Sequence, residues 1–208
     1  PSDKRLLTPK LNEIKPFIDE ALALGVEQFS FTGGEPFLAK DIIDILDYAS
    51  RFKPCLVLTN GTDPLVKRFE ALLALQKKNQ HPISFRISID SADKKTHDQG
   101  RGTGSFAKAF IGMRLLHNHG FNVSLARHMS KEENTDLVEQ AYQDLFELNG
   151  LPRDTHMVAF PDFLTPGSLP NVPEISTHCM TRYQNEVQRK NYMCANSKMI
   201  IKKGNAMQ

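Results

Sequence analysis

Apolar and polar positions alternate along the chain in two different periods. Short runs rich in apolar and β-branched residues, which predict strands, occupy residues 26–31, 55–60, 83–90, 121–127 and 156–160. The segments between them repeat apolar residues three and four positions apart, which is typical of helices that bury one face. These predicted helices cover residues 8–25, with Pro16 kinking or restarting the helix, and 40–52, 63–78, 105–120 and 134–150.

The alternation of strands with helices predicts an α/β fold. A parallel sheet with right-handed crossovers, either open or closing toward a barrel, is the arrangement that such an order favours. Because the first helix has no strand before it, we expect a first strand upstream of Pro1. We assign residues 1–162 to this βα core.

The composition of the sequence changes after residue 160. The segment 163–177 belongs to a proline-rich stretch and is interpreted as a linker. The tail, residues 178–208, is locally basic and is interpreted as the start of a separate small C-terminal module.

Composition and charge argue against several classes of protein. Lys and Arg total 26 against 24 Asp and Glu, so the net charge of +2 gives no electrostatic case for nucleic acid as the main partner. No apolar run approaches the roughly 18 residues of a membrane-spanning helix, and no signal peptide is visible. Three cysteines with irregular spacing do not form a secreted disulfide framework. We therefore expect a cytoplasmic protein without membrane or nucleic-acid partners.

The stretch Thr32-Gly33-Gly34-Glu35-Pro36 lies at the carboxyl end of the first predicted strand. Glycines at such a place allow close backbone approach, and a helix start there would suit a phosphate. Glu35 would repel a phosphate, however, and the Lys-Ser/Thr pair of a P-loop is absent. Exposed carbonyls beside a carboxylate suit a ligand ammonium group better. The alternative is a plain helix start at which Glu35 complements the helix dipole.

The next strand ends at Thr59-Asn60-Gly61. An Asn-Gly pair is first of all a turn signal, yet its position also places an amide side chain at the same end of the sheet. Ser124, on the predicted strand over 121–127 with Asn122, is a weaker candidate for lining the same cavity.

The strand over 83–90 has two chemically different faces. One carries Phe85, Ile87 and Ile89, and the other carries Arg86, Ser88 and Asp90. A buried parallel strand is normally apolar on both faces, so the polar side chains need partners. A hydroxyl and a carboxylate there suit a ribose or an amino-acid head group. The alternative is an edge strand whose polar face meets solvent.

The glycine-rich segment 96–106 contains Asp98 and Arg101 and lacks a dinucleotide-binding fingerprint. We interpret it as a flexible loop capped at Ser105. His117 and His119 point to different sides of a helix and are expected to be exposed to solvent rather than to bind a metal together.

Taken together, these stretches resemble radical S-adenosylmethionine enzymes. The resemblance rests on Thr32 to Pro36 and, in order, on "TNG" (59–61), "ISIDS" (87–91) and "HDQGRGTGSF" (97–106), and it covers residues 8–160. It implies a partial (β/α)6 TIM-like barrel lacking its first strand. It further implies that Gly33, Gly34 and Glu35 hold the methionine amino group of the cofactor. Ser88 and Asp90 would lie near its ribose or carboxylate, in a cofactor site that also includes Thr32, Pro36, Asn60 and Ser124.

The sequence departs from this family at the iron–sulfur cluster. The family's [4Fe–4S] cluster is held by a C-x-x-x-C-x-x-C loop, which is missing from these 208 residues and which we expect upstream of Pro1. Cys194, followed after nine residues by Gly204, resembles the opening of a SPASM-type auxiliary cluster domain, and Cys179 is a second candidate ligand. The alternative is that both cysteines are inert. Cys55, inside an apolar strand, is expected in the core.

The resemblance implies an iron–sulfur enzyme of the oxidoreductase type. The reduced cluster would cleave S-adenosylmethionine to a 5′-deoxyadenosyl radical that abstracts hydrogen from a small-molecule, peptide or protein substrate, with electrons from a donor such as flavodoxin or ferredoxin. Two other functions stay open. One is a cluster-free barrel hydrolase or aldolase using Glu35 and Asp90 as acid and base. The other is a non-catalytic barrel that binds a nucleoside or a peptide.

Overall fold

The computed structural model describes residues 6–161, 185–189, 197–204 and 206–207. The chain divides into two compact units. The larger unit consists of Pro1–Lys4 and Thr8–Phe163, and the smaller unit consists of Arg5–Leu7 and Leu164–Gln208. The division of the chain at 162 and 177 stays a prediction, because 162–184 lies outside the described residues.

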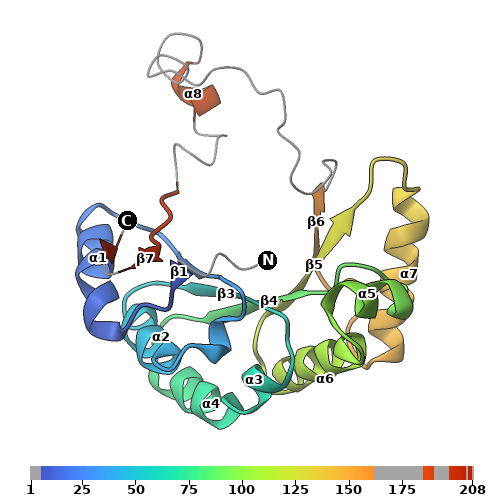
Figure 1. Cartoon of the computed structure of the whole chain (residues 1–208), viewed down its shortest axis with the longest axis horizontal. Coiled ribbons are helices and arrows are strands. Elements are labelled where there is room, and N and C mark those ends of the chain that lie inside the picture. The colour runs from blue at the N-terminus through green and yellow to red at the C-terminus, as the bar shows by residue number, and fades with distance from the viewer. Residues whose placement is uncertain (1–5, 162–184, 190–196, 205, 208) are drawn as a thin grey trace. The chain divides into compact units, whose positions relative to one another are not determined.

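The larger unit is built on a parallel sheet of five strands, counted over its described residues (Figure 1). In spatial order these are β2 (Phe29–Phe31), β3 (Cys55–Thr59), β4 (Ile83–Ser88), β5 (Val123–Met129) and β6 (Met157–Pro161). Every neighbouring pair is parallel, so each connection must cross over through a helix. The sheet curls into a partial TIM-like barrel, which confirms the predicted α/β fold.

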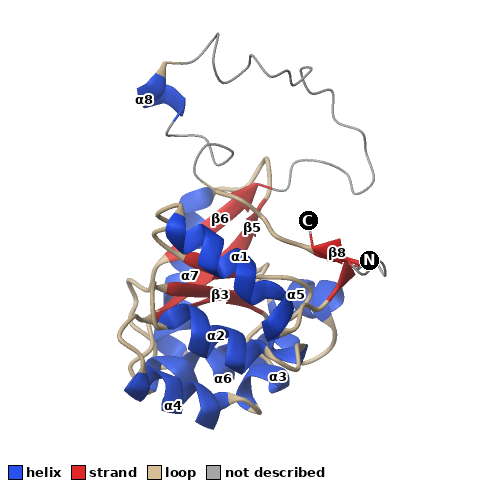
Figure 2. Cartoon of the chain, turned by 90° about the vertical axis from the view of Figure 1, so that its left-hand side faces the viewer, coloured by secondary structure: helices blue, strands red, loops and turns tan. Residues whose placement is uncertain are grey.

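Helices occupy the connections between the strands. They are α1 (Leu11–Ala23), η1 (Pro36–Leu38), α2 (Ile42–Ser50), α3 (Asp63–Val66), α4 (Phe69–Lys78), α5 (Lys94–Arg101), α6 (Ser105–Asn118) and α7 (Thr135–Leu148). Figures 1 and 2 show α2, α4 and α6 on one side of the strands. The prediction of a single helix over 63–78 is wrong in detail, because this segment forms α3 and α4.

The interpretation of 96–106 as a flexible loop is wrong. Its first half belongs to α5, which begins after Asp93, whose side chain accepts a hydrogen bond from Thr96 N at 2.8 Å. Ser105 is not the cap of α6 either. The carboxylate of Asp98 accepts hydrogen bonds from Gly104 N at 2.8 Å and Phe106 N at 2.9 Å, and Ser105 donates its hydroxyl to the same carboxylate. An acceptor seven residues before the helix start thus replaces the local cap that the sequence suggested.

The core lies between the sheet and these helices. From the strands it contains Cys55, Val57, Phe85, Ile87, Ile89 and Leu125, and from the helices Leu46, Leu72, Phe110, Met113 and Phe146. The prediction that Cys55 is a core residue is confirmed, and its burial raises the pKa of the thiol to about 12. Helix side chains therefore cover the strand face that carries Phe85, Ile87 and Ile89, and the opposite face is left for the site.

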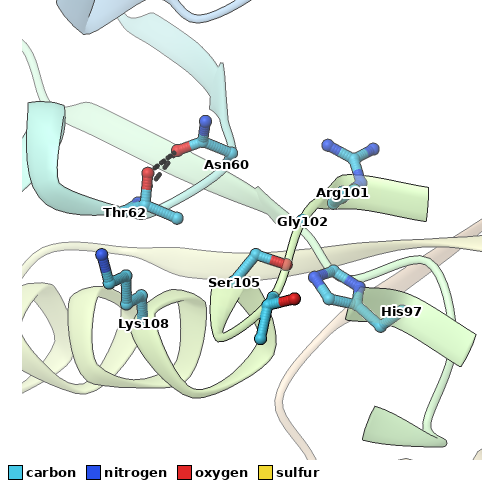
Figure 3. Close-up of a pocket in the computed structure, with 8 residues that line it drawn as sticks. Asn60, Thr62, His97, Arg101, Gly102, Ser105 and Lys108 are labelled. Carbon is cyan, nitrogen blue, oxygen red and sulfur yellow. Dashed lines mark hydrogen bonds between the residues drawn. The ribbon is translucent and has the colours of Figure 1, made fainter. Parts of the chain in front are cut away.

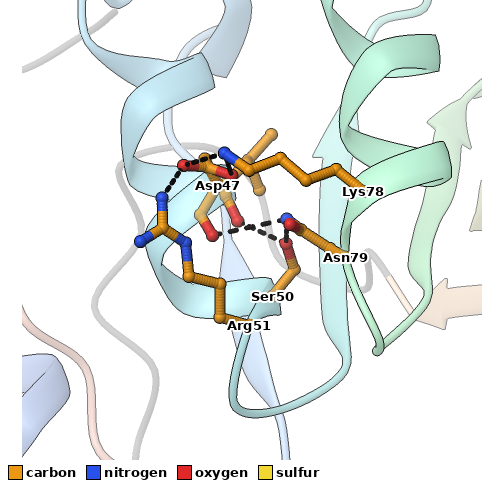
Figure 4. Close-up of polar contacts among 6 residues, drawn as sticks. Asp47, Ser50, Arg51, Lys78 and Asn79 are labelled. Atoms are coloured by element: carbon orange, nitrogen blue, oxygen red, sulfur yellow. Dashed lines mark hydrogen bonds and ion pairs between the residues drawn. The ribbon is translucent and has the colours of Figure 1, made fainter.

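Polar contacts tie α2 to the end of α4 at the edge of this core (Figure 4). Asp47 pairs with Arg51 on its own helix and with Lys78 of α4, whose Nζ lies 3.0 Å from Asp47 Oδ1. Asn79 Nδ2 donates to the buried hydroxyl of Ser50 at 2.5 Å, and that hydroxyl donates to Leu46 O. Both a charged and a neutral contact thus fix the packing of these two helices.

Two glycines bring α6 into direct contact with the loop after β3. A Cβ atom on Gly112 would lie only 2.0 Å from Gly61 O, and Gly61 itself has a φ of +71°. The backbone of this loop can therefore reach its position only because residue 112 carries no side chain.

The smaller unit contains an antiparallel sheet among its described residues. β1 (Leu6–Leu7), β7 (Lys202–Lys203) and β8 (Ala206–Met207) pair in the order β1-β7-β8, and α8 (Glu186–Arg189) is a single short helix. Across the described ranges of both units, no helix has the length and apolar character needed to cross a membrane.

We predict that Gly112→Ala destabilises the protein by about 2 kcal/mol or more, because the added methyl group collides with backbone that cannot move away without cost. Gly100→Ala is the matched control, since a Cβ at Gly100 in α5 would meet nothing within 4 Å. That change should be neutral or stabilising by about 0.5–1 kcal/mol. Urea unfolding of both variants measures the difference, and equal stability of the two would show that the contact is absent.

The ion pairs of Asp47 generate a prediction about acid stability. Burial alone would raise the pKa of Asp47, but hydrogen bonds from Lys78 and Arg51 lower it below its ordinary value. The ionised carboxylate therefore stabilises the fold above the ordinary pKa, and this contribution is lost as the pH falls through the folded-state value.

Asp47→Asn should accordingly destabilise the protein by about 0.5–1 kcal/mol at pH 7, and the difference from wild type should shrink toward zero in acid. Asp44→Asn, on the exposed side of the same helix, serves as the control. Urea unfolding at pH 7 and near pH 3 measures both. A cost of Asp47→Asn that stays constant with pH would contradict the assignment to charge.

Candidate functional site

The three predicted polar stretches lie at the carboxyl ends of three adjacent strands. Thr32 to Pro36 follow β2, Asn60 and Gly61 follow β3, and Ser88 to Asp90 end β4 and continue beyond it. Ligands of parallel βα folds gather at this edge. The fold thus brings together segments that are up to about sixty residues apart in the chain.

Glu35 links the first two of these stretches. Its Oε1 accepts hydrogen bonds from Phe37 N at 3.0 Å and from Thr59 Oγ1 at 2.8 Å, and its Oε2 accepts one from Asn60 N at 2.8 Å. Glu35 also caps η1, and Pro36 occupies the first position of that short helix. The alternative interpretation of Glu35 as a residue of a helix start is therefore confirmed in part, because its carboxylate also binds the next strand.

The backbone just before Glu35 is accessible. Thr32, Gly33 and Gly34 are exposed, and nothing lies within 4 Å of the place that a Cβ would take at either glycine. Peptide groups at this turn can therefore meet a ligand directly, as the sequence predicted.

Asn60 and Gly61 form the turn that their sequence indicates. Asn60 Oδ1 accepts hydrogen bonds from Thr62 N at 2.9 Å and from Thr62 Oγ1 at 2.7 Å, which is an Asx-turn. Asn60 and Thr62 also line a pocket of about 310 Å³ (Figure 3). The other residues that line this pocket are His97, Arg101, Gly102, Thr103, Ser105 and Lys108.

The polar face of β4 is confirmed, and the alternative of an edge strand is wrong. β4 is the middle strand of the sheet, with β3 on one side and β5 on the other. Arg86 and Ser88 are half-buried on the face that the helices do not cover. Arg86 Nε donates to Ser124 Oγ at 3.3 Å, so the predicted site residue Ser124 is buried beneath this guanidinium.

A second pocket, of about 150 Å³, lies over this face. Its apolar part comes from Leu58, Ala126 and Phe160, and Ser88, Asp90, Arg101, Arg127 and His128 also line it. The lining thus combines an apolar surface with hydroxyl and charged groups.

Asp90 has charged neighbours that sequence reasoning did not assign to it. Arg101 Nη2 donates to Asp90 Oδ1 at 2.8 Å, and Arg101 Nε pairs with Asp90 Oδ2. His128 Nε2 lies 3.6 Å from Asp90 Oδ1. The signal for Arg101 was present in the segment 97–106, but treating that segment as a loop hid the helix that aims Arg101 at Asp90. The buried residue His97 was missed for the same reason.

The described part of the chain holds no cluster of three or more His, Cys, Asp or Glu side chains that could bind a metal ion. Cys179 and Cys194 lie outside the described residues, so their assignment to an auxiliary cluster stays a prediction. His119 is exposed as expected, with Nδ1 2.8 Å from Leu115 O, and His117 is half-buried.

Known proteins share this chain's core. A family model described as the radical SAM superfamily matches residues 3–145. The antilisterial bacteriocin subtilosin biosynthesis protein AlbA of Bacillus subtilis is 34% identical over 142 residues, which cover 67% of this chain and 31% of that protein. The AdoMet-dependent heme synthase of Methanosarcina barkeri is 33% identical over 135 residues, covering 62% and 37%. The mycofactocin maturase MftC of Mycolicibacterium smegmatis is 27% identical over 129 residues, covering 62% and 32%.

The matched parts make up only 31%, 37% and 32% of these three relatives. The chain thus spans about a third of their length. The family model's match, residues 3–145, includes β2 to β5 and the stretches that follow β2, β3 and β4. Fold, ordered motifs and family model agree, and the chain belongs to the radical SAM superfamily.

Proposed function

We propose that this chain is the cofactor-binding core of a radical S-adenosylmethionine enzyme, with its site at the carboxyl edge of the sheet. The observation that carries the proposal is the convergence of the three family stretches. Those after β2 and β3 are joined by Glu35, and the third ends β4 in the same sheet. Membership of an enzyme superfamily supports catalysis, and the reaction itself belongs to the proposal.

The residues at this edge fit S-adenosylmethionine in charge and polarity. The exposed backbone of Gly33 and Gly34, beside the carboxylate of Glu35, suits the methionine ammonium group. The pocket over β4 and β5 suits the nucleoside, because Leu58, Ala126 and Phe160 offer an apolar surface and Ser88 a hydroxyl at its rim. Thr32, Pro36, Asn60, Asp90 and Ser124 complete the proposed site, with Asn60 acting through the turn after β3.

The residues of this chain fit S-adenosylmethionine, but they do not fit a [4Fe–4S] cluster. Its three-cysteine sequence is missing from the 208 residues, and Cys55 is buried with a raised thiol pKa that opposes the thiolate form needed for iron. When bound, cofactor and cluster together supply one-electron radical chemistry. The chain's own residues bind and orient the cofactor, and the sheet on which it lies keeps water from one side of it.

The substrate is proposed from the relatives. Similarity to a bacteriocin biosynthesis protein and to a maturase supports a peptide or protein substrate. Relatives named for heme synthesis and for GTP cyclisation support a small molecule instead. We favour the peptide because AlbA has the highest identity of the three relatives compared above, and we propose a flavodoxin or ferredoxin as electron donor and an auxiliary cluster at Cys179 and Cys194.

The cluster-free alternative is disfavoured by the geometry. Acid–base catalysis needs carboxyl groups within reach of a substrate proton. Both oxygens of Glu35 accept hydrogen bonds from the protein, and both oxygens of Asp90 pair with Arg101. A non-catalytic binding barrel stays distinguishable by its lack of turnover.

The first prediction concerns activity. The intact protein, reconstituted anaerobically with iron and sulfide and then reduced, should convert S-adenosylmethionine to methionine and 5′-deoxyadenosine, measured by chromatography. Glu35→Gln should lower this turnover at least about tenfold, because it removes the negative charge beside the ammonium group. Glu139→Gln, an exposed change on α7, is the control. Tight cofactor binding without product would favour the non-catalytic barrel.

The second prediction separates the two halves of the site. Ser88→Ala should weaken binding of S-adenosylmethionine and of 5′-deoxyadenosine alike, by roughly three- to tenfold, since both ligands carry the nucleoside. Glu35→Gln should weaken only S-adenosylmethionine, because 5′-deoxyadenosine has no ammonium group. Equilibrium dialysis of both ligands, with circular dichroism as a folding check, decides this. Equal effects of Glu35→Gln on both ligands would overturn the ammonium assignment.

A further inference from the structure

His97 is a buried histidine with a hydrogen-bonding role that the proposed chemistry does not use. Its side chain is 2% exposed, and its Nδ1 lies 3.1 Å from Asp90 N, which donates to it. An imidazole that accepts at Nδ1 carries its proton on Nε2 and is neutral. The ring packs edge-on against Phe106 of α6, with centroids 5.6 Å apart.

The backbone of Asp90 needs this partner because the strand ladder ends before it. β3 stops at Thr59, which pairs with Ile87, so β3 does not reach Asp90. On the other side, Ile89 N donates to Ala126 O and Asp90 O accepts from His128 N. Within the described residues, Nδ1 of His97 is the acceptor for the Asp90 amide. Without His97 this N–H group would lose that acceptor, in a place that is only partly open to water.

The same helix also holds the side chain of Asp90. Arg101 follows His97 by four residues, so both project from one face of α5. Arg101 pairs with both carboxylate oxygens, while His97 accepts from the main chain. Tyr142 OH donates to Ile89 O at 2.8 Å, and this carbonyl belongs to the same peptide group as the Asp90 amide that His97 accepts from.

We propose that His97 is a positioning residue of the cofactor site: its neutral ring fixes the backbone of Asp90 while Arg101 fixes the carboxylate, so that α5 sets the polar rim of the nucleoside pocket. The inference rests on the proposed function for its ligand, and on the hydrogen bonds of His97 and Arg101 to Asp90 for its geometry. His97 and Arg101 also line the neighbouring pocket of about 310 Å³, where Figure 3 shows them on the same side.

The position of His97 makes this arrangement sensitive to acid. Burial lowers the pKa of His97, and the positive charge of Arg101 lowers it further. The negative charges of Asp90 and Asp98 raise it, but by less. Lys108 is the other cation that lines the pocket of about 310 Å³. Phe106, the aromatic neighbour of His97, is uncharged. A protonated Nδ1 cannot accept from Asp90 N, so the contact is present at neutral pH and is lost as the pH falls through the lowered folded-state pKa.

Two variants separate the hydrogen bond from the packing. In His97→Asn, Oδ1 stands three bonds from Cα, as Nδ1 does in histidine, and can accept from Asp90 N. In His97→Leu, a methyl group takes that place. Both variants lose the ring contact with Phe106 to a similar degree. His119→Leu, a change at an exposed histidine directly after α6, is the control.

The affinity for S-adenosylmethionine, measured by equilibrium dialysis with the intact protein, should fall about tenfold in His97→Leu and by less than about threefold in His97→Asn. The affinity of wild type should fall at acidic pH through a step that His97→Asn lacks. Equal losses in the two variants, or no loss in a folded His97→Leu, would overturn the proposal.

A second measurement keeps this test independent of the cofactor. Nitrogen NMR of wild type should show the His97 proton on Nε2, and amide exchange at Asp90 should accelerate in His97→Leu but not in His97→Asn. If wild type binds no S-adenosylmethionine, the proposed function fails, and the role of His97 in a cofactor site fails with it even where the NMR confirms the contact. If wild type binds the cofactor while the Asp90 amide exchanges equally in all variants, only the positioning role is overturned.

Discussion

The carboxylate of Glu35 joins the ends of two neighbouring strands, and the polar edge of the sheet depends on this contact. Three donors converge on it: the amides of Phe37 and Asn60 and the hydroxyl of Thr59, which is 3% exposed. A partly buried anion needs such donors, because leaving it without them costs several kcal/mol. The contact sets the course of the chain after β2 relative to the turn after β3. Since the lone pairs of Glu35 face the protein, a cationic ligand would meet the backbone of Gly33 and Gly34 and feel the charge behind it.

The two faces of the sheet differ in composition and in role. The helix-covered face is apolar and buries Val57, Phe85 and Ile87 completely, which supplies most of the stabilising burial. The other face carries Arg86 and Ser88 in the middle strand, where a purely structural sheet would place apolar residues. Such a face costs stability unless its groups are paired or meet a ligand; Arg86 is paired with Ser124, and the hydroxyl of Ser88 lines the pocket above the sheet. The close approach of Gly61 and Gly112 couples the two faces, because it lets α6 press against the loop that leads to the site.

The sequence predicted the parts of this architecture that depend on periodicity, and missed those that depend on contacts between distant residues. The five strands, and helices over most of the predicted segments, follow from apolar spacing, and the two-faced pattern of Phe85 to Asp90 located the polar face correctly. α5 was missed because its eight residues are polar apart from one glycine and include four charged side chains, a composition that local rules assign to loops. Its cap by Asp93 is a local signal present in the sequence, whereas its anchoring through His97 is visible only when β4 is in place. The partner of Asp90 was missed for the same reason.

The charges along the edge differ from one strand to the next, and this difference orients the proposed ligand. The partners of Glu35 are neutral donors, so its negative charge is retained at the end of β2 and β3. At β4, by contrast, the charge of Asp90 is balanced by Arg101, with His128 nearby. A ligand with a cationic end and a neutral end gains from placing the cation on the β2 side and the neutral group over β4 and β5. In S-adenosylmethionine the ammonium group stands in the amino-acid part, together with a carboxylate and next to the sulfonium, and the nucleoside part is uncharged. The negative charge of Glu35 and the apolar surface at Leu58 and Ala126 therefore favour placing the ammonium group on the β2 side and the nucleoside over β4 and β5.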